Sequence, residues 1–149
     1  MIGAGLRSAI ATLVERKTRH TILVALPGGH SAPVVRNKLI EAITKLPAGL
    51  RRTLTWDQGN ELFLHDSIEA ATGIAIYFAD PHSPWQRGTN ENTNGLLRGY
   101  YPKGSDLDNI TDEQLAVVAA ELNDRPRACL GDRTPAQLMK RFAPQYNAA

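Results

Sequence analysis

Apolar residues near the start of the chain alternate in two short runs, as they do in β-strands. The run "SAIATLVE" covers Ser8–Glu15, the run at His20–Leu26 reads "HTILVAL", and the polar segment "RKTR" separates them. Two such runs joined by a short polar segment are typical of a β-hairpin. The pattern therefore predicts an antiparallel strand pair that ends at Pro27, Gly28 and Gly29.

The spacing of apolar residues then changes to three or four positions, which is the repeat of an α-helix. The residues at this spacing are Val35, Leu39, Ile43 and Leu46. Ser31 stands where it can cap such a helix, and Pro47 stands where it would stop it. We therefore expect a helix between these two residues.

Strands and helices alternate in the middle of the chain. Arg52–Trp56 reads as a short strand, and Glu61–Thr72 reads as a helix that Gly73 ends. Ile74–Ala79 is the next expected strand, and a loop then leads into the asparagine-rich stretch at 88–98, which reads as a helix. Strands joined through a helix in this way favour parallel pairing.

Two capping boxes mark helices in the last third of the chain. Thr111 and Gln114 form the first box, and Thr134 and Gln137 form the second. Pro135 falls at the first helical position, where its missing N–H costs nothing. The predicted order is β-β-α-β-α-β-α-α-α, which implies an α/β fold with a mixed sheet and helices on its faces.

Composition is that of one globular domain. The chain has 149 residues, of which 42% are hydrophobic and 21% charged, and no apolar run approaches a membrane span. The single Cys129 excludes an internal disulfide and a cysteine zinc site. We expect one cytoplasmic domain over residues 1–149, with 105–149 as its C-terminal helical part.

Charge is divided unevenly along the chain. Residues 1–52 hold nine Lys or Arg against two acids, whereas residues 53–149 hold eight against thirteen. This asymmetry favours a basic surface beside an acidic one, as an anion-binding protein with a metal site would have. Random variation of the surface is the alternative.

Two acids stand out as candidate metal ligands. Asp57 directly follows a predicted strand, at the edge where open α/β sheets place their sites, although Asp in a turn is the structural alternative. Glu91 follows after 33 intervening residues, on the asparagine-rich helix, where neutralisation by Arg87 is the alternative. Two carboxylates that converge from a strand end and a helix can hold Mg²⁺.

The neighbours of Glu91 suit nucleic acid. Helical spacing places Arg87, Asn94 and Arg98 on its face, and these side chains are donors for phosphate oxygens and nucleotide edges. Gly95 on the same face costs stability inside a helix, which close approach of a large ligand would explain. Trp85 and the tyrosines at 100 and 101 can stack on bases, with packing as the alternative for the tyrosines.

Four segments together resemble the catalytic core of bacterial DDE transposases of the insertion-sequence-thirty family, within the retroviral-integrase-like superfamily. They are "TLVERKTR", "TWDQGNE", "YFADPHSPWQRGTNENTNGLLRGYYPKG" and "LNDRPRACLGDRTPAQL". The resemblance implies a ribonuclease H-like fold, an Asp-Asp-Glu triad with two Mg²⁺ (or Mn²⁺) ions, and cleavage and strand transfer of DNA. It also implies homo-oligomers on DNA, in the bacterial cytoplasm at the nucleoid and without a membrane partner.

The resemblance assigns roles to individual residues. Asp57 and Glu91 match the second and third acids of the triad. The expected DNA contacts are Trp85, Arg87, Asn90, Asn94, Arg98 and Lys103.

One departure from the family pattern affects the expected activity. The first Asp of the triad would fall about two residues upstream of Met1, so this Asp and most of the first core strand are expected to be missing. Glu15 is the acid on the following strand, and we do not expect it to substitute. Catalysis is therefore expected to be impaired, and a non-catalytic DNA-binding or oligomerising remnant is the alternative. An independent ribonuclease H-like nuclease is a third hypothesis.

Overall fold

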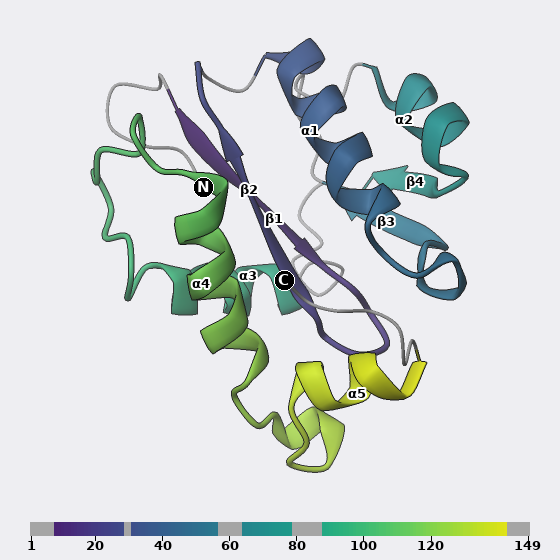
Figure 1. Cartoon of the computed structure of the whole chain (residues 1–149), viewed down its shortest axis with the longest axis vertical. Coiled ribbons are helices and arrows are strands. Elements are labelled where there is room, and N and C mark those ends of the chain that lie inside the picture. The colour runs from purple at the N-terminus through teal and green to yellow at the C-terminus, as the bar shows by residue number, and fades with distance from the viewer. Residues whose placement is uncertain (1–7, 29–30, 57–63, 79–87, 143–149) are drawn as a thin grey trace.

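The computed structural model describes residues 8–28, 31–56, 64–78 and 88–142. Its strands are β1 (Ala9–Val14), β2 (Thr21–Leu26), β3 (Thr53–Trp56) and β4 (Ala75–Phe78). Its α-helices are α1 (Ala32–Thr44), α2 (His65–Thr72), α3 (Gly88–Leu97), α4 (Asp112–Asn123) and α5 (Pro135–Phe142) (Figure 1). Short 3₁₀ helices lie at Ala48–Leu50 and Ala128–Leu130. The predicted order of strands and α-helices is confirmed.

Strands β1 and β2 form the predicted hairpin. They pair antiparallel, with Ala9 opposite Leu26 and Val14 opposite Thr21. One further backbone bond, from the N–H of Glu15 to the carbonyl of His20 at 2.8 Å, extends the ladder to the turn. The alternating pattern therefore located both strands to within a residue or two.

The hairpin turn is held by the carboxylate of Glu15. One oxygen accepts the backbone N–H of Lys17 at 2.9 Å, and the other accepts the N–H of Thr18 at 2.6 Å and its hydroxyl at 2.7 Å. Thr18 is fully buried, and Arg19 adopts a left-handed conformation with φ of 61°. These hydrogen bonds hold the backbone of the turn and so fix the positions from which its outward-pointing side chains extend.

Strands β3 and β4 pair parallel, with Thr53 opposite Ala75 and Trp56 opposite Phe78. The α/β class with both antiparallel and parallel pairing is thus confirmed. Within the described ranges the four strands form two separate two-stranded ladders. A cleft of about 310 Å³ has both Val14 of β1 and Thr53 of β3 in its lining, so the facing ends of the two ladders border one hollow.

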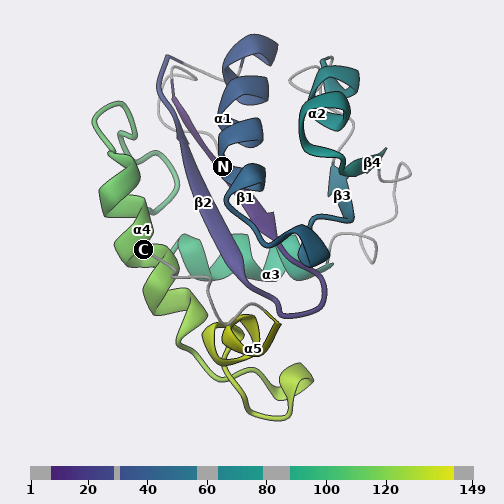
Figure 2. The same ribbon diagram turned by 45° about the vertical axis from the view of Figure 1, so that its right-hand side comes forward.

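Both faces of the hairpin are buried. On one face, side chains such as Ala11 and Leu13 pack against Leu39 of α1. On the other face, Ile10 packs in a second cluster with Leu97 of α3, and α4 joins it (Figure 2). Burial on both sides explains why apolar residues occupy adjacent as well as alternate positions in the two strands.

Helix α1 begins after Ser31 as expected, but the side chain of Ser31 makes no capping hydrogen bond. Pro33 falls in the first helical turn and lacks one of the N–H groups that a capping oxygen would accept. The helix ends at Thr44, three residues before Pro47. The predicted position of the N-cap is therefore confirmed, but the capping hydrogen bond from its side chain is not formed.

The other helix ends follow the local sequence. Gly73 ends α2 in a left-handed conformation with φ of 71°. Thr111 and Gln114 make both bonds of a capping box at α4. The second box, at the start of α5, is equally complete, with bonds of 3.0 and 3.1 Å between Thr134 and Gln137. These predictions are confirmed because each depends on residues only three apart.

Helix α4 covers the outer edge of β2. The side-chain amide of Asn123 accepts the N–H of Thr21 at 2.8 Å and donates to its carbonyl at 2.9 Å. At the other end of α4, Asp112 accepts the N–H of Ala25 at 3.2 Å. Two side chains of α4 thus take the place that a neighbouring strand would occupy, which blunts an otherwise open edge.

Candidate active site

One candidate acid, Asp57, directly follows a strand of the parallel ladder in the sequence. Strand β3 ends at Trp56, so Asp57 is the first residue beyond its carboxyl end. Because β4 runs parallel to β3, both strands end at the same edge of the ladder. Open α/β sheets place their ligands outside such ends. Asp57 itself lies outside the described residues.

Glu91 belongs to α3, which packs against β1. The packed face of the helix includes Thr93 and Leu97, which are 3% and 0% exposed. Leu96 is partly buried against the same cluster, as expected. The backbone of Glu91 is thus on the predicted helix, while its side chain lies outside the described part of the chain.

The expected DNA contacts fall into two groups. Arg98 and Lys103 are exposed, and Asn94 is half-buried with a side-chain oxygen that has no hydrogen-bond partner among the described residues. Trp85 and Arg87 lie outside the described ranges, as does the side chain of Asn90 on α3. The structure places Asn94 in α3 and Arg98 directly after it, and all six DNA-contact assignments stay predictions.

Gly95 is exposed on α3, and a Cβ atom built there would meet nothing within 4 Å. No packing among the described residues therefore requires glycine at this position. The proposed close approach of a ligand to this face remains a prediction.

The tyrosines after α3 pack rather than project. Tyr100 and Tyr101 are half-buried against the cluster formed by α3, α4 and the hairpin. The Tyr100 hydroxyl donates to Glu121 at 2.7 Å and accepts from Arg125 at 3.1 Å. The packing alternative is thus favoured over base stacking for both residues.

Glu15 is occupied elsewhere. Both of its carboxylate oxygens accept hydrogen bonds within the hairpin turn. This bonding agrees with the expectation that Glu15 does not replace a missing catalytic acid.

No group of three His, Cys, Asp or Glu side chains is placed to hold a metal ion in the ranges that the structure describes. Those ranges leave out Asp57 and the side chain of Glu91. The donor set that the sequence offers is two carboxylates, and carboxylate oxygens are suitable ligands for Mg²⁺. The chemistry of these donors fits the ion.

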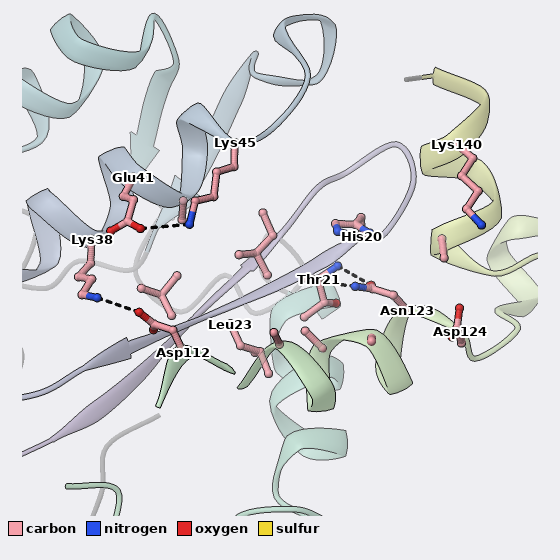
Figure 3. A pocket seen from close by; sticks show the side chains of 17 residues that line it. His20, Thr21, Leu23, Lys38, Glu41, Lys45, Asp112, Asn123, Asp124 and Lys140 are labelled. Atoms are coloured by element: carbon pink, nitrogen blue, oxygen red, sulfur yellow. Dashed lines mark hydrogen bonds and ion pairs between the residues drawn. The ribbon is translucent and has the colours of Figure 1, made fainter. Parts of the chain in front are cut away.

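A pocket of about 620 Å³ is lined by residues of β2, α1, α4 and α5 (Figure 3). Lys38 reaches across it to Asp112 at 2.9 Å, and Lys45 pairs with Glu41 at 3.1 Å. Burial is the largest single influence on the pKa of Asp112 and raises it, but the hydrogen bonds from Lys38 and the Ala25 N–H, with the nearby ammonium charges, together hold this pKa below its usual value. Of the predicted site residues whose side chains the structure describes, namely Asn94, Arg98 and Lys103, none lines this pocket.

His20 lines the same pocket and is 4% exposed. Burial lowers the pKa of its imidazole to about 4, although Glu15 nearby opposes the shift. No pattern in the sequence indicates a role for this histidine or the pairing of Lys38 with Asp112, which are 74 residues apart.

No helix within the described ranges has the length and apolar character that crossing a membrane requires.

Comparison with known proteins gives close relatives. The chain is 51% identical over 134 residues to the transposase InsI for insertion sequence element IS30A of Escherichia coli, which covers 90% of this chain and 35% of that protein. It is 49% identical over 137 residues to the transposase for element IS1086 of Cupriavidus metallidurans, and 37% identical over 149 residues to that for IS4351 of Bacteroides fragilis. The alignments cover 40% and 45% of these two proteins. No family model matches the chain.

A solved structure shows the same fold. A chain from the cryo-EM structure of a simian T-cell lymphotropic virus intasome, in complex with the PP2A regulatory subunit B56 gamma, superposes with a TM-score of 0.55. The match covers 93% of this chain and 57% of the viral chain at 21% identity. The fold is ribonuclease H-like. The chain spans little more than a third of the length of the first relatives, and over that span it is homologous to the transposases of the insertion-sequence-thirty family.

Proposed function

We propose that this chain is part of the catalytic core of a transposase that cleaves and joins DNA phosphodiester bonds. The observation that carries the proposal is the 51% identity over 134 residues. An alignment of that length within 149 residues must include both Asp57 and Glu91. Because the chain matches only part of its relatives, the activity is proposed for the longer protein.

In this proposal Asp57 and Glu91 hold divalent metal. Asp57 follows β3 directly, and Glu91 is carried by α3, so the two acids come from separate elements of the fold. Bound Mg²⁺ would lower the pKa of a bound water and stabilise charge on the phosphodiester oxygens. The two carboxylates themselves provide hard oxygen ligands on rigid elements.

The proposed DNA contacts continue along and beyond α3. Arg98 and Lys103 are exposed and charged, and they would contact phosphates. Asn94 is half-buried, and its side-chain oxygen is buried without a hydrogen-bond partner among the described residues, so a DNA contact would be made by the exposed part of the side chain. Arg87 and Asn90 would contact DNA phosphates or bases, and Trp85 would position the loop before the helix and contact DNA.

In this proposal the first acid of the triad, the Asp that precedes Asp57 in the family pattern, is supplied by a part of the longer protein that is not in this chain. The cleft between Val14 of β1 and Thr53 of β3 supports this view, because an added strand there could join the two ladders. We propose that residues upstream in the longer protein supply this strand and the first Asp. This chain alone should then bind metal weakly and catalyse poorly.

The alternative is a non-catalytic fragment that binds DNA or associates with the full transposase. The two separate ladders favour it, because a sheet without a joining strand has open edges. Calorimetric titration of the 149-residue chain with Mn²⁺ distinguishes the two. Binding that is lost in Asp57→Asn and in Glu91→Gln, but retained in the control Glu113→Gln, supports a metal site. An absence of binding heat in the wild-type chain supports the fragment.

A further inference from the structure

Five basic side chains from three separate elements gather at one end of the molecule. We call this surface the basic end and define it by Arg16, Lys17, Arg52, Lys140 and Arg141. The first two belong to the hairpin turn, the third precedes β3, and the last two lie in the final turn of α5. The turn and α5 lie next to each other in both views (Figures 1 and 2).

Side-chain contacts show that these elements meet. The ammonium of Lys17 lies 4.1 Å from the centre of the Phe142 ring, which joins the turn to α5. Leu46 and Leu50 pack with Met139 of α5, which joins the segment before β3 to the same helix. Arg16, Lys17 and Arg52 also line one cleft. The three elements therefore meet at one end of the molecule, where Lys140 also borders the neighbouring pocket that Asp124 helps to line (Figure 3).

The charge of this surface is largely unneutralised. All five side chains are exposed, and none has an ion pair within the described ranges. The acid beside them, Glu15, uses both carboxylate oxygens in the turn. Lys38 and Lys45, by contrast, are each paired with a carboxylate. Free cations held together at one end create a local field that attracts anions.

The presentation of the charges is also fixed in advance. The Glu15 bonds and the left-handed Arg19 hold the turn, so Arg16 and Lys17 project from a rigid loop. Lys140 and Arg141 extend from a helix whose start is capped. Rigid presentation reduces the ordering entropy that binding would otherwise cost.

We propose that the basic end binds the phosphate backbone of double-helical DNA at a place distinct from the edge that carries Asp57. Arg52 precedes the first residue of β3, whereas Asp57 follows the last one. The four-residue strand between them is about 13 Å long. The inference rests on the proposed function only in taking DNA as the partner.

Arg and Lys contacts to phosphates carry no sequence information directly. Binding at the basic end should therefore be independent of base sequence and steeply dependent on salt. Each phosphate neutralised contributes about −0.9 to the slope of log K against log salt concentration.

The test measures binding of a mixed-sequence duplex of about 30 base pairs by fluorescence anisotropy in EDTA, between about 50 and about 200 mM salt. The variants Arg16→Gln/Lys17→Gln and Lys140→Gln/Arg141→Gln each remove two charges from the basic end. The control Arg36→Gln/Lys38→Gln removes two charges from the first half of α1. Circular dichroism melts establish that each variant is folded.

We expect each basic-end variant to lower the salt slope by about 2 and to weaken binding about tenfold or more at the lower salt concentrations. The control should change neither quantity by a comparable amount. Equal effects in the control and the basic-end variants, or no DNA binding by the wild-type chain, would overturn the inference. Because EDTA removes metal, this result is independent of whether Asp57 and Glu91 support cleavage.

Discussion

Replacing Asn123 should destabilise the fold well beyond the loss of one side chain. Its amide makes two hydrogen bonds with the backbone of Thr21, 102 positions earlier in the sequence, at 2.8 and 2.9 Å. Asn123 is 4% exposed and Thr21 is 1% exposed, so water cannot easily replace the lost partner. The variant Asn123→Leu has a similar volume and removes both bonds without a large cavity.

The magnitude follows from the two groups that are left unpaired. A buried polar group without a partner costs about 1–3 kcal/mol, so the N–H and the carbonyl of Thr21 together cost about 2–6 kcal/mol. A typical domain is stable by only about 5–15 kcal/mol. The edge of β2 would also be exposed to pairing with other chains.

Urea unfolding followed by circular dichroism measures the free energy of unfolding, and size-exclusion chromatography measures association. The matched control is Asn37→Ala, because Asn37 is exposed on α1 and bonds only to the adjacent Arg36. The control should stay within about 0.5 kcal/mol of wild type. An Asn123→Leu variant as stable as this control would refute the view that α4 completes the edge of β2.

Two further predictions concern the core and its pH dependence. Because the pKa of folded His20 is about 4 and that of an unfolded histidine is 6.5, stability should be complete above about pH 6.5 and decline as the pH falls toward 4. The loss should be about 2 kcal/mol between pH 7.5 and pH 5, measured by urea unfolding, and a His20→Gln variant that loses as much would contradict it. Leu39→Ala should lower the free energy of unfolding by about 3 kcal/mol because Leu39 is completely buried. Val117→Ala, at a side chain that is 62% exposed, should change it by less than about 0.5 kcal/mol, and equal losses would count against the assigned core.

The parts of the fold that were predictable are those whose causes are local. The hairpin follows from alternation within two short runs and a turn between them. The capping boxes at Thr111 and Thr134 follow from pairs of residues three positions apart. Ser31 occupies the predicted N-cap position but its side chain makes no capping hydrogen bond. Pro33, in the first turn, has no backbone N–H to donate to the Ser31 hydroxyl.

The parts that were not predictable depend on residues far apart in the sequence. Nothing near Asn123 indicates that its amide will bond the backbone of Thr21. The same holds for the pairing of Lys38 with Asp112 and for the approach of Lys17 to Phe142. The connections between strands indicate whether neighbouring strands run parallel or antiparallel, but not which pairs join into one sheet. The sequence therefore predicted a single mixed sheet, whereas the described residues form two separate ladders, β1–β2 and β3–β4.

The sequence correctly predicted the strand and the helix next to which the two candidate acids fall, while the roles of the acids stay predictions. Asp57 follows the end of β3 and Glu91 lies on α3, as the motif indicated. The structure reassigns Tyr100 and Tyr101 to packing and Glu15 to the turn. These side chains are polar or amphipathic, and the sequence alone does not distinguish a ligand contact from a buried or capping role.

Strand cleavage by the longer transposase tests the central claim most directly. The measurement compares Glu91→Gln with the control Glu113→Gln on labelled DNA that carries the element ends, with Mg²⁺ present. If Glu91 is a metal-binding carboxylate, Glu91→Gln should abolish cleavage and leave DNA binding intact. The control Glu113→Gln should cleave as well as the wild-type protein. Cleavage retained in Glu91→Gln would contradict the assignment of this chain to the catalytic core.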